Sequence, residues 1–337
     1  RIRRGDHLLN ESSRDEIDLS GFTYDGISGA QTTLSDMIAN SYTDAFLVAK
    51  DGVILTEQYF NNMSASSFHL MNSVSKSFLG ILIGGLVDEG TLDTTKLITD
   101  YIPEFEDTAF KATTLQHALD MTGAVKYGED YTNTDADFWQ ETAVVGWRPA
   151  LITSRSAETL FDYAKSLKDT EQDDGSHFHY RTVFTNVLAM VVARASHESV
   201  QDLLETRVWN KLEPEQDAAI VCDRSGFPYF GAGMNACARD LMRFGQMIAQ
   251  GGQYNENRVV SSAWIDDLVE GNDRIRQSFA ESDYGALRPG GHYHNQFWGS
   301  APGEQVATCI GIHGQFIHVD LSSQVVIVKL SSQPDAA

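Results

Sequence analysis

The sequence predicts an α+β fold in which strands from both ends of the chain form one antiparallel sheet. Two β-rich runs lie within residues 45–60, on either side of Lys50-Asp51-Gly52, a pattern typical of a hairpin. Residues 314–332 read as a strand, a Ser-rich turn and a second strand. Apolar residues at helical spacing dominate the chain between these runs, so we expect helices to flank the sheet.

The remaining elements follow in order along the chain. Residues 1–40 are polar and weakly patterned, and an apolar helix is expected over 69–90, ending at Gly90. Pro103 ends the next periodic stretch, and the aromatic-rich residues 124–152 read as a loop. Further helices are expected at 113–123, 154–167, 185–196, 200–212 and 235–251.

Length and composition favour one large functional unit. The chain has 337 residues, 42% of them hydrophobic, which is ample for a large core. The order of elements predicts an α/β lobe built from residues 1–95 and 199–337, with an all-helical lobe, residues 96–198, inserted between them. A functional site is expected at the interface of the two lobes.

Charge and cysteine content exclude several classes of protein. The formal net charge is −22, from 47 acidic and 25 basic residues, which is the wrong sign for binding nucleic acid. The sparse, odd set of Cys222, Cys237 and Cys309 does not resemble a disulfide framework, so we expect small buried residues. Nucleic acid is therefore set aside as a partner, and the composition leaves the oligomeric state open.

Targeting signals are weak. The longest apolar run, Phe78 to Val87, is about half of a membrane span, so no membrane span is expected. The chain opens on Arg1 without the apolar core of a signal peptide, consistent with a truncated N-terminus. Bacterial cytoplasm and periplasm both remain open as compartments.

The helix over 69–90 carries an unexpected polar start. Ser73 and Lys76 are three residues apart, which places both side chains on one helical face. A serine hydroxyl becomes a good nucleophile only when a base takes its proton, and burial lowers the pKa of a lysine so that it can serve as that base. The alternative is structural: Asn72 or Ser73 caps the helix and Lys76 extends to solvent.

The stretch NSVSKSFLGILIGGLVDEG resembles the first motif of the serine β-lactamase and penicillin-binding-protein superfamily. The resemblance is greatest to its 6-aminohexanoate-dimer hydrolase branch, which is esterase-like and similar to class C β-lactamases. It extends through LQHALDMTGAVKYGEDY, FHYRTVFTNVLAMVV, GMNACARDLMRFGQMI and GIHGQFIHVD, in that order. It implies the β-lactamase/transpeptidase-like fold, a Ser73 nucleophile, a Lys76 base and no cofactor.

The second motif of the superfamily corresponds to Tyr180 in FHYRT. In the relatives, a tyrosine here shares a proton with the lysine and passes it to the leaving group. A phenol with a pKa of about 10 suits that role if a cation lowers its pKa, which we expect Lys76 to do. The class C pattern is Tyr-x-Asn, whereas this chain has Thr182 at the third position. This departure fits the 6-aminohexanoate-dimer hydrolase branch, where a hydroxyl residue is usual.

The third motif, Lys-Thr-Gly in β-lactamases, is replaced by ATCIGIHGQ. If Gly311 takes the place of the motif glycine, Cys309 stands where the lysine would be, and the amides of Ser73 and Ile312 form the oxyanion hole. A second register places His313-Gly314 there instead. Either register removes the cation that binds the carboxylate of a β-lactam.

Other positions are expected near the substrate. The resemblance places Gly146, Trp147 and Asn235 there, with packing for Trp147 and a helix cap for Asn235 as the alternatives. Gly311 and His313 are further candidates for substrate binding. The pairs His177/His179 and His292/His294 have no third ligand set by spacing, so no metal site is expected.

The resemblance implies a serine hydrolase of small linear amides or short-chain esters. A class C-like β-lactamase or a D-Ala-D-Ala carboxypeptidase is the alternative enzyme. A binding or sensor protein that is acylated without turnover is the non-enzyme alternative.

Overall fold

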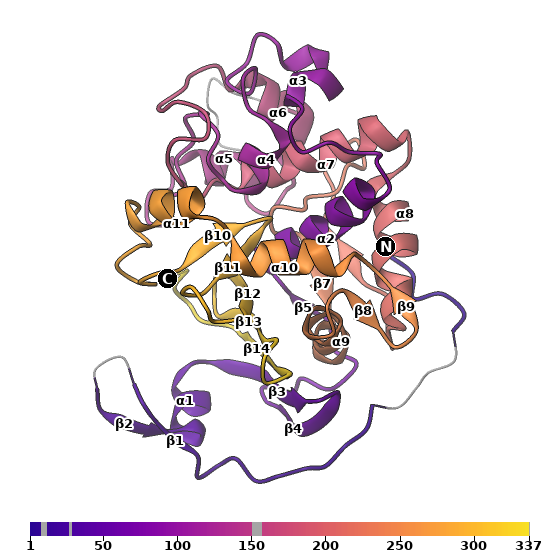
Figure 1. Ribbon diagram of the computed structural model, residues 1–337, viewed down its shortest axis with the longest axis vertical. Helices are drawn as coiled ribbons and strands as arrows, with labels where there is room; N and C mark the ends of the chain where they lie inside the picture. Colours follow the sequence, from indigo (N-terminus) through magenta and orange to yellow (C-terminus); the bar gives the residue numbers. More distant parts are fainter. Residues whose placement is uncertain (8–11, 27–28, 150–156, 337) are drawn as a thin grey trace.

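A seven-stranded antiparallel sheet forms the centre of the computed structural model, which describes residues 1–7, 12–26, 29–149 and 157–336. The strand order is β10–β11–β12–β13–β14–β3–β4 (Figure 1). The strands are β3 (Thr43–Lys50), β4 (Val53–Tyr59), β10 (His292–His294), β11 (Phe297–Gly299), β12 (Val306–Gly311), β13 (Gln315–Asp320) and β14 (Val325–Ser331).

Strands from both ends of the chain meet inside this sheet. β14 pairs with β3, so that Ile327 lies opposite Val48. Alternate side chains of β3 point to opposite faces: Leu47 enters the main core, whereas Phe46 and Val48 pack under helix α1 (Leu34–Asn40). The α+β fold with a sheet from both ends is therefore confirmed.

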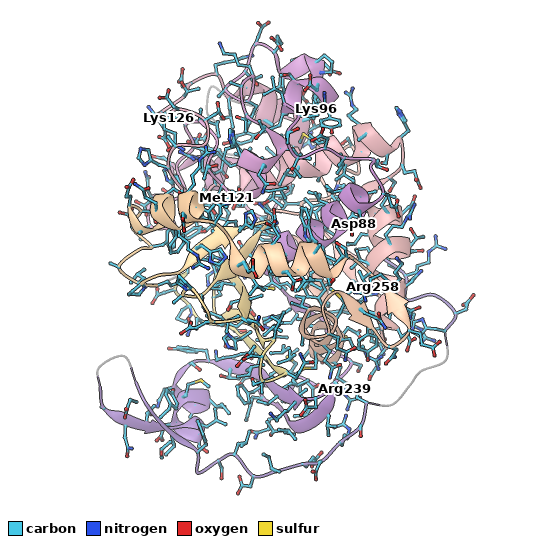
Figure 2. The ribbon with its side chains drawn as sticks, viewed as in Figure 1. Asp88, Lys96, Met121, Lys126, Arg239 and Arg258 are labelled. Atoms are coloured by element: carbon cyan, nitrogen blue, oxygen red, sulfur yellow. The ribbon has the colours of Figure 1, made fainter. Side chains whose placement is uncertain are left out.

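Helices cover the other face of the sheet. Helix α9 (Ala238–Ala249) packs on β3, β13 and β14, while α10 (Ser262–Glu270) packs on β11 and β12. Helix α11 (Asp273–Ala280) lies beside β10. Figure 2 labels Arg239 at the start of α9, and its Nε donates to Glu57 Oε1 of β4 at 2.6 Å, so this end of the helix is tied to the edge strand.

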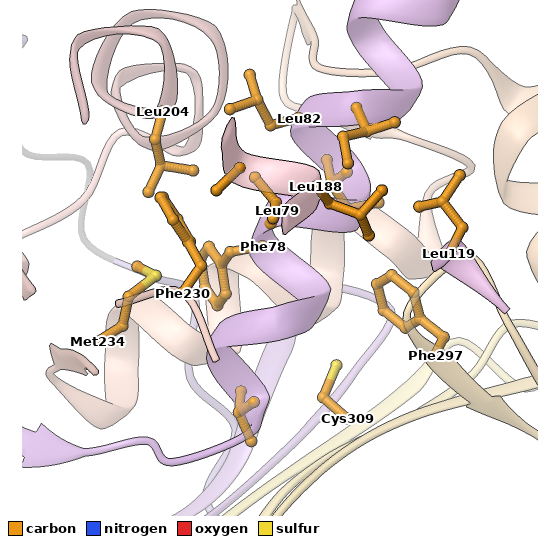
Figure 3. Packing of buried hydrophobic residues seen from close by; sticks show 14 of the residues in the cluster. Phe78, Leu79, Leu82, Leu119, Leu188, Leu204, Phe230, Met234, Phe297 and Cys309 are labelled. Atoms are coloured by element: carbon orange, nitrogen blue, oxygen red, sulfur yellow. The ribbon is translucent and has the colours of Figure 1, made fainter. Parts of the chain in front are cut away.

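Helix α2 (Val74–Asp88) is the buried helix that the sequence predicted over 69–90, although residues 69–70 form strand β5 instead. It is apolar all round because it is surrounded on every side. Figure 3 shows Phe78, Leu79 and Leu82 among side chains from several other elements. These neighbours include Leu119, Leu188, Leu204, Phe230, Phe297 and Cys309.

A group of helices lies above the sheet in Figure 1. It comprises α3 (Ile98–Tyr101), α4 (Leu115–Leu119), α5 (Asp137–Val144), α6 (Leu160–Ser166) and α7 (Val183–Ser196), with a 3₁₀ turn at Pro103–Phe105. Helix α8 (Val200–Leu204) and the π turn at Glu205–Trp209 pack beside α2, and a 3₁₀ turn at Asn210–Leu212 follows. The lobe boundaries at 95/96 and 198/199 stay a prediction.

Several sequence predictions need correction. Helix α5 lies inside the stretch read as a loop, because Phe138, Glu141 and Val145 share a buried helical face. The helix expected over 154–167 begins at Leu160, and residues 150–156 lie outside the described residues. Residues 200–212 contain one short helix followed by π and 3₁₀ turns, and 234–236 form a strand rather than a helix start.

Short strands complete the described chain. They are β1 (Thr23–Asp25), β2 (Gln31–Thr33), β5 (His69–Leu70), β6 (Ala219–Ile220), β7 (Met234–Ala236), β8 (Gln253–Tyr254) and β9 (Asn257–Arg258). Cys237 and Cys309 are buried, as expected, Cys222 is half-buried, and all three thiols are free. Among the described helices, none combines the length and apolar composition that crossing a bilayer requires.

Candidate active site

Ser73 and Lys76 lie together at the start of α2. Ser73 immediately precedes the helix and makes no side-chain cap, and both side chains are buried. The Lys76 ammonium donates to Ser73 Oγ at 2.8 Å, Thr182 Oγ1 at 3.0 Å and the carbonyl of Gly231 at 2.6 Å. Lys76 therefore does not extend to solvent, and its Nζ lies within proton-transfer distance of the Ser73 hydroxyl.

The surroundings of Lys76 adjust its basicity. Burial lowers its pKa to about 8, although the nearby carboxylates of Glu129 and Glu141 oppose that shift. A lysine with this pKa exchanges its proton close to neutral pH, as a general base for Ser73 must. The arrangement thus places a buried hydroxyl beside an amine whose pKa is lowered.

Tyr180 lies on the other side of Ser73. It is buried just before α7, hydrogen-bonds to Ser73, and its ring centroid is 5.0 Å from Lys76 Nζ. Its ring stacks on Trp298, with centroids 5.4 Å apart, and meets Tyr293 edge-on. The prediction that Lys76 lowers the phenol pKa is wrong: burial raises it well above 10, so the phenol stays protonated.

Thr182 connects Lys76 to a carboxyl group that sequence reasoning missed. Its hydroxyl accepts from Lys76 and donates to Glu129 Oε1 at 2.6 Å, and its backbone amide donates to Glu129 Oε2 at 2.6 Å. Tyr131 donates to the same carboxyl group at 2.8 Å. Burial raises the pKa of Glu129, while Lys76 and the bonds from Thr182 oppose the shift. Glu129 lies in KYGEDY, but no spacing rule links it to Ser73.

A second carboxyl group, Glu141 of α5, lies deeper beneath Lys76. It accepts from the Tyr127 hydroxyl and from Asn186 Nδ2, the latter at 2.6 Å. Asn186 Oδ1 in turn accepts from the Gly231 amide at 3.0 Å, and the Gly231 carbonyl binds Lys76. Burial raises the pKa of Glu141 to about 7. This chain of bonds fixes the carbonyl acceptor of Lys76, and no motif in the sequence pointed to it.

The end of β12 packs against the backbone at Ser73. A Cβ atom on Gly311 would lie 2.5 Å from the Met71 carbonyl oxygen and 3.1 Å from the Ser73 nitrogen, so only glycine fits. Neither the Ser73 amide nor the Ile312 amide donates a hydrogen bond to any described residue. The role of these two N–H groups as oxyanion-hole donors stays a prediction.

The turn after β12 distinguishes the two possible alignments of ATCIGIHGQ with the third motif. His313 has φ +64° in the turn after β12, and its Nδ1 is 2.7 Å from the Gln333 carbonyl. The first register, with Gly311 against Ser73, fits this arrangement better. Cys309 is then the residue in place of the motif lysine, and burial raises the pKa of its thiol to about 12, so the position is uncharged.

The other predicted substrate residues lie in three places. Gly146, at φ +77°, ends the turn after α5, and the ring of Trp147 meets Tyr229 edge-on with centroids 5.5 Å apart. Asn235 lies in β7 opposite Leu70 and donates to the Gly233 carbonyl at 3.1 Å, so it is not a helix cap. Contact of these residues with substrate stays a prediction.

The two histidine pairs differ in burial. His292 and His294 are buried in β10, where His294 binds Asp120 and Asp267. His179 lies 2.9 Å from Glu171, and His177 is exposed. Over the described residues, no three His, Cys, Asp or Glu side chains converge as a metal site would require.

Comparison with known proteins agrees with this geometry. Residues 36–337 match the β-lactamase family. The chain belongs to the β-lactamase family. It is 33% identical over 312 residues to the 6-aminohexanoate-dimer hydrolase of Paenarthrobacter ureafaciens, covering 92% of this chain and 78% of that protein.

Solved structures of β-lactamase-family proteins show the same fold. A "putative 6-aminohexanoate-dimer hydrolase" from Bacillus anthracis superposes with a TM-score of 0.87 at 26% identity, covering 100% of this chain and 85% of that one. A penicillin-binding protein from Bacillus halodurans has a TM-score of 0.65 at 16% identity, covering 90% and 96%. The chain is therefore an enzyme of the β-lactamase-fold hydrolase class.

Proposed function

We propose that this β-lactamase-family chain is a serine hydrolase that cleaves small linear amides or short-chain esters through an acyl-enzyme. The observation that carries the proposal is the 2.8 Å hydrogen bond between Lys76 Nζ and Ser73 Oγ in a buried setting that lowers the lysine pKa. The unpaired amides of Ser73 and Ile312 supply donors for the oxyanion.

The proposed acylation balances its protons through Lys76 and Tyr180. Ser73 Oγ forms a bond to the substrate carbonyl carbon and gives its proton to the neutral amine of Lys76. The carbonyl oxygen becomes an oxyanion and is held by the two amides. When the bond to the amine or alcohol breaks, the Tyr180 hydroxyl protonates the leaving group and recovers its proton from Lys76. Water then attacks the acyl-enzyme by the reverse sequence of transfers.

The raised pKa of Tyr180 suits a proton donor rather than a resting phenolate base. Lys76 therefore carries the role of base in the first step, and Thr182, bound between Lys76 and Glu129, orients the amine. The Gly231 carbonyl holds Lys76 from a second direction. These bonds fix the amine so that its lone pair, once free, points to Ser73.

Two observations support a linear amide or ester over a β-lactam. The relative from Paenarthrobacter ureafaciens is named as a 6-aminohexanoate-dimer hydrolase. In the register that places Gly311 at the motif glycine, the uncharged thiol of Cys309 corresponds to the cation that binds the β-lactam carboxylate in the superfamily. We therefore expect nitrocefin to be turned over slowly or not at all.

The test is hydrolysis of p-nitrophenyl acetate and butyrate, followed by the linear dimer of 6-aminohexanoate. Ser73→Ala should abolish ester turnover, and mass spectrometry of a fluorophosphonate-treated wild type should find the label on Ser73. Ser77→Ala is a matched control, because this hydroxyl lies on the same helix but donates to the Gln296 carbonyl. Turnover that survives in Ser73→Ala would refute the proposal.

A further inference from the structure

The residue before the nucleophile has an uncommon backbone conformation. Asn72 is buried and has φ +49°, in the left-handed region that asparagine tolerates better than most residues. It follows β5, where the Met71 amide donates to the Met234 carbonyl at 2.9 Å. The chain therefore turns sharply at Asn72 and enters α2 through Ser73.

This turn fixes the direction of the Ser73 amide. The carbonyl of Asn72 accepts from the Ser75 amide at 3.0 Å and from Ser75 Oγ at 2.6 Å. In a trans peptide, the C=O and the following N–H point in opposite directions. Because Ser75 holds the carbonyl on the helix side, the Ser73 N–H points away from the helix and stays unpaired within the described structure.

The side chain of the same residue reaches the carbonyl of Ile312, the residue that carries the second amide. Asn72 Nδ2 donates to the Ile312 carbonyl at 2.8 Å, joining two residues that are far apart in the sequence. Gln315 Nε2 supports this turn by donating to the His313 carbonyl at 3.0 Å. Gly311 allows the close approach, since any Cβ atom there would meet the backbone of Met71.

We infer that Asn72 is a positioning residue that sets the spacing of the two oxyanion-binding amides. Its backbone aims the Ser73 amide, and its side chain holds Ile312, which carries the other amide. The inference rests on the proposed function, because it requires those two amides to bind the oxyanion. Asn72 touches neither the nucleophile's hydroxyl nor Lys76 in any hydrogen bond of the described residues, so it acts only by placing the two amides.

Two substitutions remove the Asn72 side-chain donor and leave a positive φ accessible. Asn72→Gly keeps access to positive φ but removes the amide, whereas Asn72→Asp keeps the shape but cannot donate to the Ile312 carbonyl. Both should lower kcat by roughly 10- to 100-fold, somewhat less than the loss of a complete oxyanion donor, with KM changed less than about threefold. Affinity for a boronic acid, a tetrahedral mimic, should fall in the same proportion.

Asn255→Gly is the matched control. Asn255 also has a positive φ, +51°, but lies exposed in the turn between β8 and β9, where its side chain binds Glu213. This variant should retain wild-type kcat and boronic acid affinity. The turnover rate of each variant is divided by its folded fraction, which circular dichroism measures, so that a loss of stability is not counted as a loss of catalysis.

The outcomes distinguish the inference from the proposed function. If Ser73→Ala is inactive but either Asn72 variant keeps kcat and boronic acid affinity within about twofold of wild type, Asn72 does not position the donors and the inference fails. A loss of kcat without a matching loss of boronic acid affinity would also overturn it. If Ser73→Ala is as active as wild type, the proposed function fails and the inference falls with it.

Discussion

His294 and Asp120 form a buried ion pair, with imidazole Nδ1 2.7 Å from carboxylate Oδ1. The other ring nitrogen lies 2.8 Å from Asp267 Oδ2. One imidazole of β10 thus joins the residue after α4 to helix α10, on either side of the sheet's edge. The pair lies outside the candidate active site, so its effect on stability can be measured without changing the catalytic groups.

We predict that His294→Gln loses stability in a pH-dependent way. Burial disfavours the charged ring, but Asp120 and Asp267 outweigh it and raise the pKa of His294 to about 10. Because the folded pKa is above the unfolded value, the stabilisation is fully present below about pH 6.5 and is lost as the pH rises through about 10. Chemical denaturation at pH 6 should show His294→Gln less stable by about 2–3 kcal/mol, with the gap shrinking by pH 10. A gap that widened with pH would contradict this.

The pH dependence of catalysis should follow the titration of the Lys76 amine. Its pKa of about 8 predicts that kcat/KM for an ester rises with pH and levels off above about 8, as the neutral amine forms. Lys76→Ala should lower kcat/KM by about 1,000-fold or more and remove this rise. A quenched end-point assay with p-nitrophenyl butyrate, run from about pH 5.5 to about pH 9.5, measures the pH profile of the wild type and the loss in Lys76→Ala. A flat wild-type profile would exclude Lys76 as the titrating base.

Glu129→Gln should move that profile to lower pH. The Glu129 carboxylate raises the pKa of Lys76, so a neutral amide in its place leaves the lysine more acidic. The introduced amide has only one acceptor oxygen, so Thr182 loses one of its two bonds and kcat should fall by roughly tenfold. Asp130→Asn, a neighbouring exposed carboxylate, serves as the control and should leave the midpoint unchanged. A shift to higher pH in Glu129→Gln would show the assigned direction to be wrong.

Gly311→Ala should damage both stability and turnover. The added methyl group would lie 2.5 Å from the Met71 carbonyl oxygen, so the strand or the turn must move, at about 1–3 kcal/mol. The displacement also separates the Ser73 and Ile312 amides, so kcat should fall more than KM changes. Gly21→Ala is the matched control, because nothing lies within 4 Å of its Cβ position. Thermal unfolding and ester kinetics on both variants check the prediction, and equal effects at the two glycines would overturn it.

The sequence predicted the parts of the site that are local in the chain. The Ser73–Lys76 pair depends on helical spacing, and the structure brings the two side chains together as that spacing requires. The sheet from both ends followed from β-rich runs at the two ends of the chain, each pair of runs separated by a turn signal. Both patterns involve residues that are close in sequence, so they can be recognised without any knowledge of tertiary contacts.

The parts that were missed depend on contacts between distant segments. Glu129 reaches Lys76 only through Thr182, and Glu141 reaches it through Asn186 and the Gly231 peptide. Helix α5 was read as a loop because buried Glu141 interrupts its apolar face. The direction of the Tyr180 pKa shift was wrong because the sequence shows a cation nearby but not how completely the ring is buried.

The pairing of β3 with β14 also governs how the chain can fold during synthesis. Val48 leaves the ribosome roughly 280 residues before its partner Ile327, so the β3–β4 hairpin emerges with one edge unpaired. Because β14 alone lies between β13 and β3, the sheet remains in two pieces until that strand is made. Nascent chains therefore expose an unpaired strand edge for most of translation. We expect that co-expressing chaperones that shield such edges raises the yield of folded enzyme more than slowing translation initiation does.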